Sequence, residues 1–214
     1  MSTAPPALRP VFLSASIPFG DRARSYPPDP TAVKEAVRAL VAVVLPDRPL
    51  VFGGHPAITP LVWEIASRLG LVDRVFIYQS EHFRSRIPPE AVFFDKLVWT
   101  RDVGGPADRS IAHMRDLMIV RRTDETGTMR IPEFTAGVFI SGMNGVEDEW
   151  DLFRLHYPTV PVFPVASTEG AARLITRTPA RMANAPGLDP PTVTALEQDL
   201  AYRRLFRRLL SQLP

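Results

Sequence analysis

The sequence predicts an α/β protein with a doubly wound, mainly parallel sheet of the Rossmann-like kind and helices on both faces. Short apolar segments alternate along the chain with longer segments of helical periodicity. The short segments are apolar throughout, as is typical of strands whose two faces are both buried. Glycine or small polar residues follow several of them, where each expected strand passes into the next loop.

The first half of the chain supplies three expected strands and two expected helices. Residues 10–15 (PVFLSA) form a short apolar run that ends in small residues. A helix is expected at 29–45, because Asp29 is a good N-cap and Pro30 is tolerated in the first helical turn. The remaining elements of this half are a strand at 49–52, a helix at 59–69 closed by Gly70, and a strand at 74–78.

The second half continues the same alternation. A loop leads to an apolar segment at 97–99, a helix is expected at 108–118, and strands are expected at 137–140 and 160–165. The helix between the last two strands has acidic residues in its first turn, which the helix dipole favours. A last helix at 192–212 has an apolar side made of Leu196, Leu200, Tyr202, Leu205, Phe206 and Leu209.

Length and composition predict one domain. Residues 1–9 are small and proline-rich and predict a disordered lead, so the domain is expected to span 10–214. No apolar run reaches the roughly 18 residues that a membrane span needs, and the N-terminus lacks a signal-peptide pattern. The chain has no cysteine, which excludes disulfides and zinc–thiolate sites. A cytoplasmic protein with no membrane association is therefore expected.

The most informative turn follows the expected strand at 137–140. Glycine there lets the backbone approach a ligand, and the start of the next helix offers unpaired N–H groups to a phosphate. A plain strand-to-helix turn with acidic capping fits the same residues. The expected ligand-binding residues of this turn are Ser141, Gly142, Met143, Asn144, Gly145 and Val146.

This segment resembles the P-G-G-x-G-T-x-x-E signature of LOG-like phosphoribohydrolases, and more broadly the SLOG (Smf/DprA–LOG) superfamily of nucleotide-binding Rossmann-like domains. Gly142, Gly145 and Glu149 match the signature, whereas Ser141, Met143 and Val146 replace its proline, second glycine and threonine. The resemblance in strand layout covers roughly residues 10–180. It implies a nucleotide-like ligand, and the replacements place catalysis in doubt.

Arg115 is the second feature of the resemblance. The segment 113–118 (HMRDLM) is similar to the M-x-x-R-K segment of these enzymes, whose arginine works with the motif glutamate on an N-glycosidic bond. The resemblance therefore implies Arg115 and Glu149 as catalytic residues if the protein is an enzyme. The alternative is a surface arginine paired with Asp108 or Asp116.

A glycine pair closes the second expected strand. Gly53, Gly54 and His55 lie in a turn that is similar to the corresponding turn of SLOG domains associated with prokaryotic conflict and defence systems. Such a turn offers amide groups at the same sheet edge, and His55 could bind a phosphate or titrate near neutrality. Packing of His55 against its neighbouring prolines fits equally well.

Small and acidic residues after other strands complete the candidate ligand set. Ser14 and Ser16 lie at the end of the first strand, where they could bind an adenine or a phosphate. Glu81 follows the third strand, where dinucleotide folds often place an acid near the ribose. Residues 168–170 follow the last strand and are a weaker candidate. Each of these residues is also common at the end of a strand that binds no ligand.

Several function classes lack their motifs. The sequence has no G-x-S-x-G elbow, no P-loop and no H-E-x-x-H spacing, so no metal site and no cofactor are expected. The arginines are scattered, apart from two pairs in the last helix, so the sequence does not predict a nucleic-acid surface. The partners expected are a nucleotide-like small molecule and either further copies of the chain or an effector protein.

Two functions follow from the resemblance. The first is a sensor that binds a nucleotide-derived ligand, such as an ADP-ribose derivative or a cyclic nucleotide. The second is a phosphoribohydrolase that cleaves a nucleoside 5′-monophosphate. Val146 and Met143 favour binding, because a hydrolase needs its full phosphate grip, whereas Arg115 and Glu149 keep hydrolysis possible. A scaffold that has lost its ligand is the third alternative.

Overall fold

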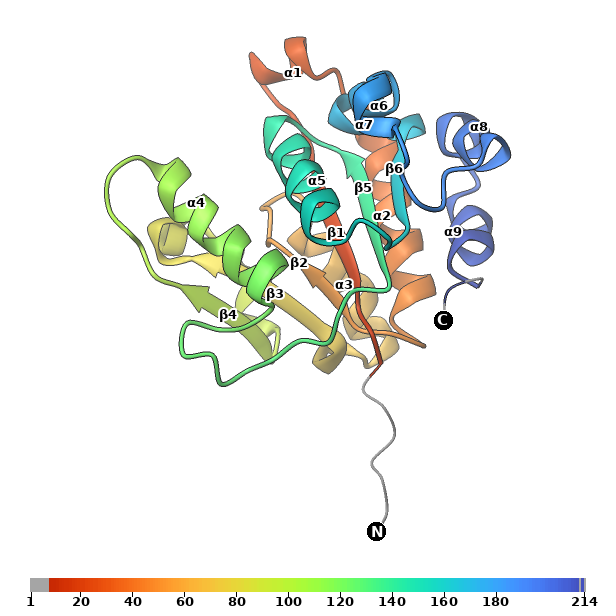
Figure 1. Ribbon diagram of the computed structural model, residues 1–214. Helices are drawn as coiled ribbons and strands as arrows, with labels where there is room; N and C mark the ends of the chain where they lie inside the picture. Colours follow the sequence, from red (N-terminus) through yellow and green to blue (C-terminus); the bar gives the residue numbers. More distant parts are fainter. Residues whose placement is uncertain (1–7, 212, 214) are drawn as a thin grey trace.

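A single sheet of six parallel strands organises the molecule (Figure 1). The computed structural model describes residues 8–211 and 213. The sheet order is β4-β3-β2-β1-β5-β6, and every neighbouring pair is parallel. The strands are β1 (Val11–Ser16), β2 (Leu50–Phe52), β3 (Val75–Ser80), β4 (Lys96–Thr100), β5 (Ala136–Ser141) and β6 (Val162–Val165). The predicted Rossmann-like fold class is confirmed.

Side chains alternate between the two faces of this sheet. On β1, Val11 and Leu13 join one core, whereas Phe12 joins the other. The first core lies under α2 (Pro30–Val44), α3 (Thr59–Leu69), α8 (Pro190–Gln198) and α9 (Tyr202–Leu210). The second lies under α4 (Ala107–Arg115), α5 (Asn144–His156) and α6 (Gly170–Thr176). The sheet is thus the middle of three layers, which explains why its strands are apolar on both sides.

The first two long helices begin and end where their sequence signals predict. Asp29 caps α2, and its carboxylate accepts hydrogen bonds from the amides of Thr31 and Ala32 at 3.0 and 2.9 Å. Gly70 ends α3 in the left-handed conformation, with φ of +66°. These local interactions decide the boundaries, because they satisfy backbone groups that the helix itself leaves free.

The segment between β3 and β5 departs from the expected pattern in two places. The loop before β4 contains two short 3-10 helices, η2 (Glu81–Arg86) and η3 (Pro89–Phe93). The expected helix at 108–118 begins at Ala107 as α4 and continues as a π-helical turn, η4 (Asp116–Arg121). Smaller elements elsewhere are α1 (Arg22–Ser25), η1 (Val72–Arg74), η5 (Ala166–Thr168) and α7 (Pro179–Met182).

The predicted C-terminal helix at 192–212 is wrong, because the structure has two helices there. Asp199 ends α8 and its carboxylate accepts a hydrogen bond from the amide of Ala201 at 2.8 Å. A short side chain that bonds the backbone locally competes with helix continuation. The break turns Leu200 out to solvent, where it is 66% exposed, instead of into the predicted apolar face.

The strand order places a switch point between β1 and β5. The chain builds β1 to β4 outward in one direction and then returns to add β5 and β6 on the other side of β1. Ligands of open α/β sheets bind outside the carboxyl ends of the strands at such a point. The predicted lead at 1–9 lies mostly outside the described residues, although Arg9 is described and donates a hydrogen bond to the carbonyl of Phe134 at 2.6 Å.

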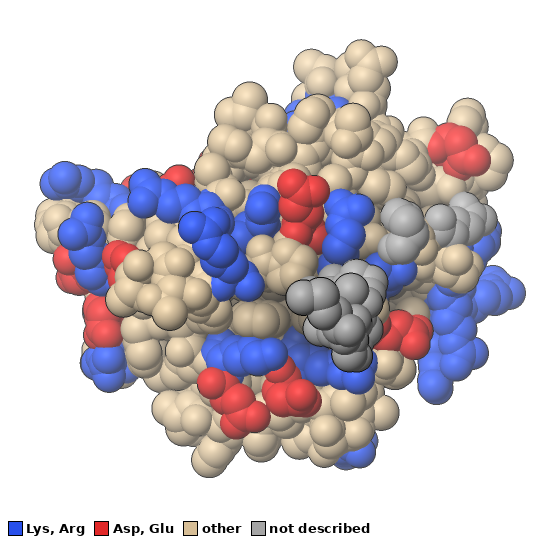
Figure 2. Space-filling model, turned by 60° about the horizontal axis from the view of Figure 1, so that its bottom comes forward, with Lys and Arg blue, Asp and Glu red and all other residues tan. Residues whose placement is uncertain are grey.

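Basic side chains gather on the side of the molecule that is opposite the carboxyl ends of the strands. Figure 2 brings the bottom of Figure 1 forward, and Lys and Arg form a band across this face that acidic side chains interrupt. A further group stands at the side where α9 lies. Within the described residues, no helix is long and apolar enough to cross a membrane.

Candidate functional site at the β1–β5 switch point

The turn after β5 has a backbone that only particular residues tolerate. Ser141 and Gly142 both have positive φ, +49° and +90°. A Cβ on Gly142 would lie 2.2 Å from Cγ2 of Val146, well inside van der Waals contact. Glycine is therefore required at 142 both by its backbone conformation and by the close approach of α5.

The last loop of the sheet fixes this turn from behind. The amide of Ser141 donates to the hydroxyl of Thr168 at 2.8 Å, and the amide of Ala171 donates to the carbonyl of Gly142 at 2.9 Å. A Cβ on Gly170 would lie 2.8 Å from that same carbonyl. The weak candidates at 168–170 thus act on the turn itself, by holding its backbone in place.

Strain is concentrated next to these contacts. Glu169 has φ of +60° and ψ of −155°, a conformation that is normally confined to glycine. Such a residue costs on the order of 1–3 kcal/mol and persists only where the surroundings hold it. Here a bridge to Pro28 and an ion pair with Arg173 hold Glu169.

Ser14, Arg115 and Glu149 meet in one cluster beside the turn. Nε of Arg115 lies 3.1 Å from Oε1 of Glu149, and the hydroxyl of Ser14 donates to Oε2 at 2.6 Å. The Arg115 and Glu149 side chains are 16% and 13% exposed. Three residues from three distant segments therefore converge, and both oxygens of the carboxylate are engaged.

The guanidinium of Arg115 is fully committed to α5. Nη1 pairs with Asp148 at 3.0 Å and Nη2 donates to the carbonyl of Gly145 at 3.0 Å. The alternative pairing with Asp108 or Asp116 is not what the structure shows, since Asp116 pairs with Arg121 at 2.7 Å. A Cβ on Gly145 would lie 2.8 Å from Nη2, so this glycine makes room for Arg115.

Two hydroxyls at the switch point have no hydrogen-bond partner within the part of the chain that the structure describes. Ser16 and Ser141 are paired in register at the ends of β1 and β5. Oγ of Ser141 is fully buried without a partner, and Ser16 is buried while its Oγ lies 3.1 Å from the ideal Cβ position of Gly142. Buried polar groups are nearly always satisfied, so unpartnered hydroxyls at a strand end indicate a ligand or water position.

The start of α5 adds backbone donors to this position. The amides of Val146 and Glu147 donate to the carbonyl of Met143 at 2.8 and 3.3 Å. Among the described residues no acceptor is recorded for the amides of Asn144 and Gly145, the first two of the helix. Free amides at a helix start favour an anion, but Val146 is 4% exposed and has no hydroxyl to add to them.

The Gly53–Gly54–His55 turn lies at the same sheet edge and serves packing. Gly54 has φ of +58°, and its carbonyl accepts a hydrogen bond from the side-chain amide of Gln79 on β3. Nδ1 of His55 accepts from the amide of Ala57 at 3.1 Å, and burial lowers the pKa of His55 to about 4. His55 is therefore neutral at pH 7 and does not titrate near neutrality.

Glu81 is not brought to the cluster. It begins η2 after β3, two strands away from β1, and its carboxylate binds Arg84. That hydrogen bond lowers the pKa of Glu81. Among the described contacts none joins Glu81 to Ser14, Arg115 or Glu149.

Sequence reasoning missed the segment that crosses the site between β1 and α2. The hydroxyl of Tyr26 donates to Oε2 of Glu147 at 2.6 Å, while the other oxygen of Glu147 binds Arg181. The carbonyl of Pro27 accepts from the amide of Gly170 at 2.9 Å. The hydrogen bond to Glu147 raises the pKa of Tyr26 to about 12. The only sequence signal was the pair of prolines after Tyr26, which marks a rigid loop.

A sheet of six parallel strands between two layers of helices defines a Rossmann-like domain. The SLOG cluster3 family matches residues 25–210. The chain belongs to this family, which confirms the predicted SLOG relationship and makes it a nucleotide-related domain. Within the described residues, no group of three or more His, Cys, Asp or Glu side chains is arranged to hold a metal ion.

Other comparisons add little to this assignment. No curated protein matches the chain. Among solved structures, the X-ray structure of TM1055, a structural-genomics target, matches with a TM-score of 0.49 and 13% sequence identity. The match covers 87% of this chain and 89% of that one. A likeness this distant says nothing about ligand or activity.

Proposed function

We propose that this domain binds a nucleotide-derived ligand, such as an ADP-ribose derivative or a cyclic nucleotide, at the β1–β5 switch point and acts as its sensor. The observation that carries the proposal is the pair of hydroxyls of Ser16 and Ser141 at the ends of β1 and β5, of which the buried Oγ of Ser141 has no hydrogen-bond partner among the described residues. They lie next to the free amides at the start of α5 and to Arg115. Hydroxyls and backbone amides together suit the phosphate and ribose oxygens of a nucleotide, whereas the guanidinium of Arg115 is held by α5 and fixes the helix start beside them.

Several contacts favour binding over catalysis. Each oxygen of Glu149 already accepts one hydrogen bond, from Arg115 or from Ser14, and these donors favour the charged carboxylate and make it a weaker base. Val146 points into the apolar core, where the enzymes have a phosphate-gripping threonine. The ligand site therefore has donors, and its one carboxylate is weakened as a base. A sensor needs no more than that.

Hydrolysis of a nucleoside 5′-monophosphate is the second candidate, and the 3.1 Å contact between Arg115 and Glu149 favours it. In that reaction Glu149 would take a proton from water while the water oxygen bonds to the anomeric carbon. The N-glycosidic bond would break, the departing base would take up the proton that Glu149 removed from water, and Arg115 would stabilise the negative charge that develops on the base.

Isothermal titration with AMP, NAD, ADP-ribose and cyclic ADP-ribose isomers tests the proposal, with base release followed by chromatography. We expect at least one ligand to bind without turnover. Ser16→Ala should then weaken its binding about 10- to 150-fold, because one hydrogen bond to a charged group is lost. Ser167→Ala, which removes a hydroxyl that bonds Tyr202 and the carbonyl of Asp199 instead, is the control.

The two candidate functions predict opposite results. Release of adenine from AMP, lost in Glu149→Gln, would establish hydrolysis and overturn the sensor proposal. Absence of binding by every member of the panel would remove the nucleotide site altogether. Equal effects of Ser16→Ala and Ser167→Ala would move the ligand away from the switch point.

A further inference from the structure

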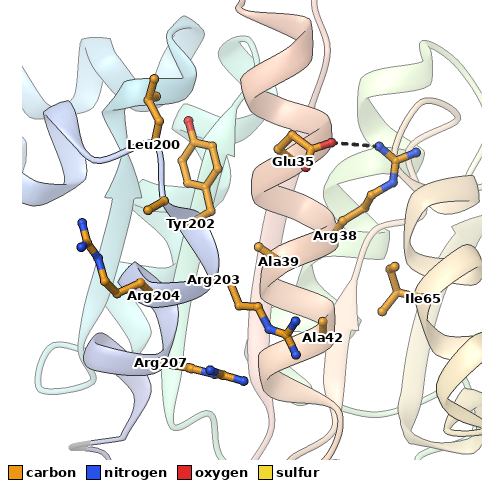
Figure 3. A pocket seen from close by; sticks show the side chains of 11 residues that line it. Glu35, Arg38, Ala39, Ala42, Ile65, Leu200, Tyr202, Arg203, Arg204 and Arg207 are labelled. Carbon is orange, nitrogen blue, oxygen red and sulfur yellow. Dashed lines mark hydrogen bonds and ion pairs between the residues drawn. The ribbon is translucent and has the colours of Figure 1, made fainter.

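A groove on the other side of the sheet has no role in the proposed function. Its volume is about 730 Å³, and residues of α2, α3 and α9 line it together with the turn that precedes α9 (Figure 3). In Figure 3, α2 forms the floor with Ala39 and Ala42, α9 forms one wall, and Ile65 of α3 stands on the other side. Because each alanine carries only a methyl group, the floor is close to the backbone of α2.

The rim of this groove is basic. Four arginines and one glutamate line it, and two of the arginines are already neutralised: Arg38 pairs with Glu35 and Glu64, and Arg204 pairs with Asp199. Arg203 and Arg207 have no acidic partner among the described residues. They lie one helical turn apart on α9, and Figure 3 shows Arg203 reaching toward Ala42. Two adjacent unpaired cations are complementary to an acidic partner.

The walls of the groove are preformed. The buried face of α9, including Leu205 and Phe206, is part of the core under α2. The hydroxyl of Tyr202, at the start of α9, lies 3.3 Å from that of Ser167. Leu200, at the upper end of the groove, is 66% exposed and offers an apolar contact that the molecule itself does not use.

The shape of the groove selects the kind of partner. The lining spans residues 35–42 on α2 and 200–207 on the α9 side, so each side is about 10 Å, or two helical turns, long. Helical walls have no free backbone groups to pair with an extended strand. Small floor residues let another helix approach closely, with its apolar face on the alanines and its acids on the rim.

We propose that the α2–α9 groove docks an amphipathic acidic helix of a partner protein, with apolar side chains on Ala39, Ala42 and Leu200 and carboxylates on Arg203 and Arg207. A nucleic acid fits less well, because the floor is apolar and the basic rim is short. The inference is independent of the ligand at the switch point, which lies at the carboxyl ends of the strands.

A designed peptide of about 18 residues tests the inference, since shorter helices are marginal in water. The probe has leucines on one face and glutamates on the other. A second peptide of equal charge carries two central prolines that break the helix. Fluorescence anisotropy with the full chain should show saturable binding of the helical peptide and much weaker binding of the broken one.

Substitutions in the chain distinguish binding of the peptide in the groove from non-specific attraction to the positive charge of the protein. Arg203→Glu with Arg207→Glu should weaken binding at least about tenfold, which corresponds to about 1.4 kcal/mol. Ala42→Trp should do the same by filling the floor without changing charge. Arg86→Glu with Arg177→Glu, two exposed arginines elsewhere, should change the affinity by less than about twofold. Circular dichroism and thermal melts confirm that each variant folds.

The alternative occupants give distinct results, each of which overturns the inference. If the proline peptide bound as tightly as the helical peptide, the groove would act only as a charged surface and would not recognise a helix. Tighter binding of duplex DNA that the Arg203/Arg207 variant abolishes would assign a nucleic acid. Self-association of the chain that Ala42→Trp abolishes would assign a second copy. Absence of peptide binding, or binding unaffected by Ala42→Trp, would also exclude a docked helix.

Discussion

At the scale of single residues, the site depends on a few backbone conformations that side chains rarely adopt. Ser141, Gly142 and Glu169 all have positive φ, and all three lie where β5, η5 and α6 meet. Each one is held by a specific contact rather than by its own preference. Strain of this kind is typical of ligand sites, where the surrounding fold can offset it.

Gly142→Ala should lower the free energy of unfolding by about 2 kcal/mol or more. The substitution combines a left-handed backbone with a Cβ that would lie 2.2 Å from Val146. Gly127→Ala is the matched control, because Gly127 has φ of +72° but nothing within 4 Å of the new Cβ. Urea unfolding should give a loss of about 1 kcal/mol for the control. Equal losses would mean that the contact with Val146 is unimportant.

His55 makes the stability depend on pH. Its folded pKa of about 4 lies below the ordinary histidine value of about 6.5, so between these values the unfolded chain binds more protons than the native one. Stability from this group is therefore complete above about pH 6.5 and is lost as pH falls toward 4. The loss should be about 1–3 kcal/mol.

His55→Asn should remove that loss while keeping an acceptor for the amide of Ala57. Thermal melts between pH 7 and 4 compare the variant with the wild type and with His156→Asn, which removes an exposed histidine. The wild type and the control should destabilise more steeply than His55→Asn. Parallel curves for all three proteins would contradict a buried neutral His55.

At the scale of elements, the short helix η5 connects the site to the rest of the fold. Thr168 accepts from the amide of Ser141 and donates to the carbonyl of Val165 at 2.6 Å. Its neighbour Ser167 contacts Tyr202 at the start of α9. One three-residue element thus contacts both the turn after β5 and one wall of the α2–α9 groove.

Thr168→Val should destabilise the protein by about 1–3 kcal/mol, because the buried amide of Ser141 loses its acceptor. Thr100→Val is a control of equal size and burial, whose hydroxyl makes only a long 3.4 Å contact with the carbonyl of Gln79. Urea unfolding should show a clearly smaller loss for the control. Hydrogen exchange of the Ser141 amide should accelerate only in Thr168→Val. Unchanged exchange would show that Thr168 does not hold the turn.

The two C-terminal helices show why element boundaries need tertiary information. Apolar periodicity over 192–212 predicts one helix, and both helices of the structure do bury residues from that pattern, including Leu196 and Leu205. Asp199 interrupts them with a local hydrogen bond to Ala201. Aspartate inside a helix is only mildly unfavourable, so its effect depends on whether a break lets both halves pack.

At the scale of the whole molecule, the sheet is held by pairings between distant segments. β1 pairs with β5, more than a hundred residues later, and the C-terminal α9 packs on α2 near the start of the chain. The last helix therefore completes the core on one face instead of forming an appendage. Its removal exposes the apolar surface that it covers.

Truncation after Gln198 should abolish cooperative folding, because Tyr202, Leu205, Phe206 and Leu209 no longer cover the core beneath α2. Burial of these side chains contributes roughly 1.5–3 kcal/mol each, which is comparable to the whole stability of a typical domain. Near-ultraviolet circular dichroism and a urea titration measure the loss. Leu200→Ala, at an exposed position of the same segment, should leave the transition unchanged. A truncated chain that unfolds cooperatively at the wild-type midpoint would contradict this role.

The sequence alone determined the fold class and most element positions, because these follow from signals that act within a few residues. Uniform apolar runs predict buried parallel strands, Asp29 and Gly70 set helix ends, and the turn around Gly142 was recognisable by its glycines. The resemblance carried by Gly142, Gly145, Arg115 and Glu149 also implied the family correctly. None of these inferences needs knowledge of which strands are neighbours.

Only the tertiary structure decided which candidates meet and what each one does. Ser14 and Glu149 are 135 positions apart, and the strand order brings them within 2.6 Å of each other. The same order leaves Glu81 two strands away, half-buries His55 so that its neutral form is favoured, and leaves room at Gly145 for Arg115. Contacts between segments far apart in sequence have no local signature, because they depend on how the sheet is wound and on what each helix covers.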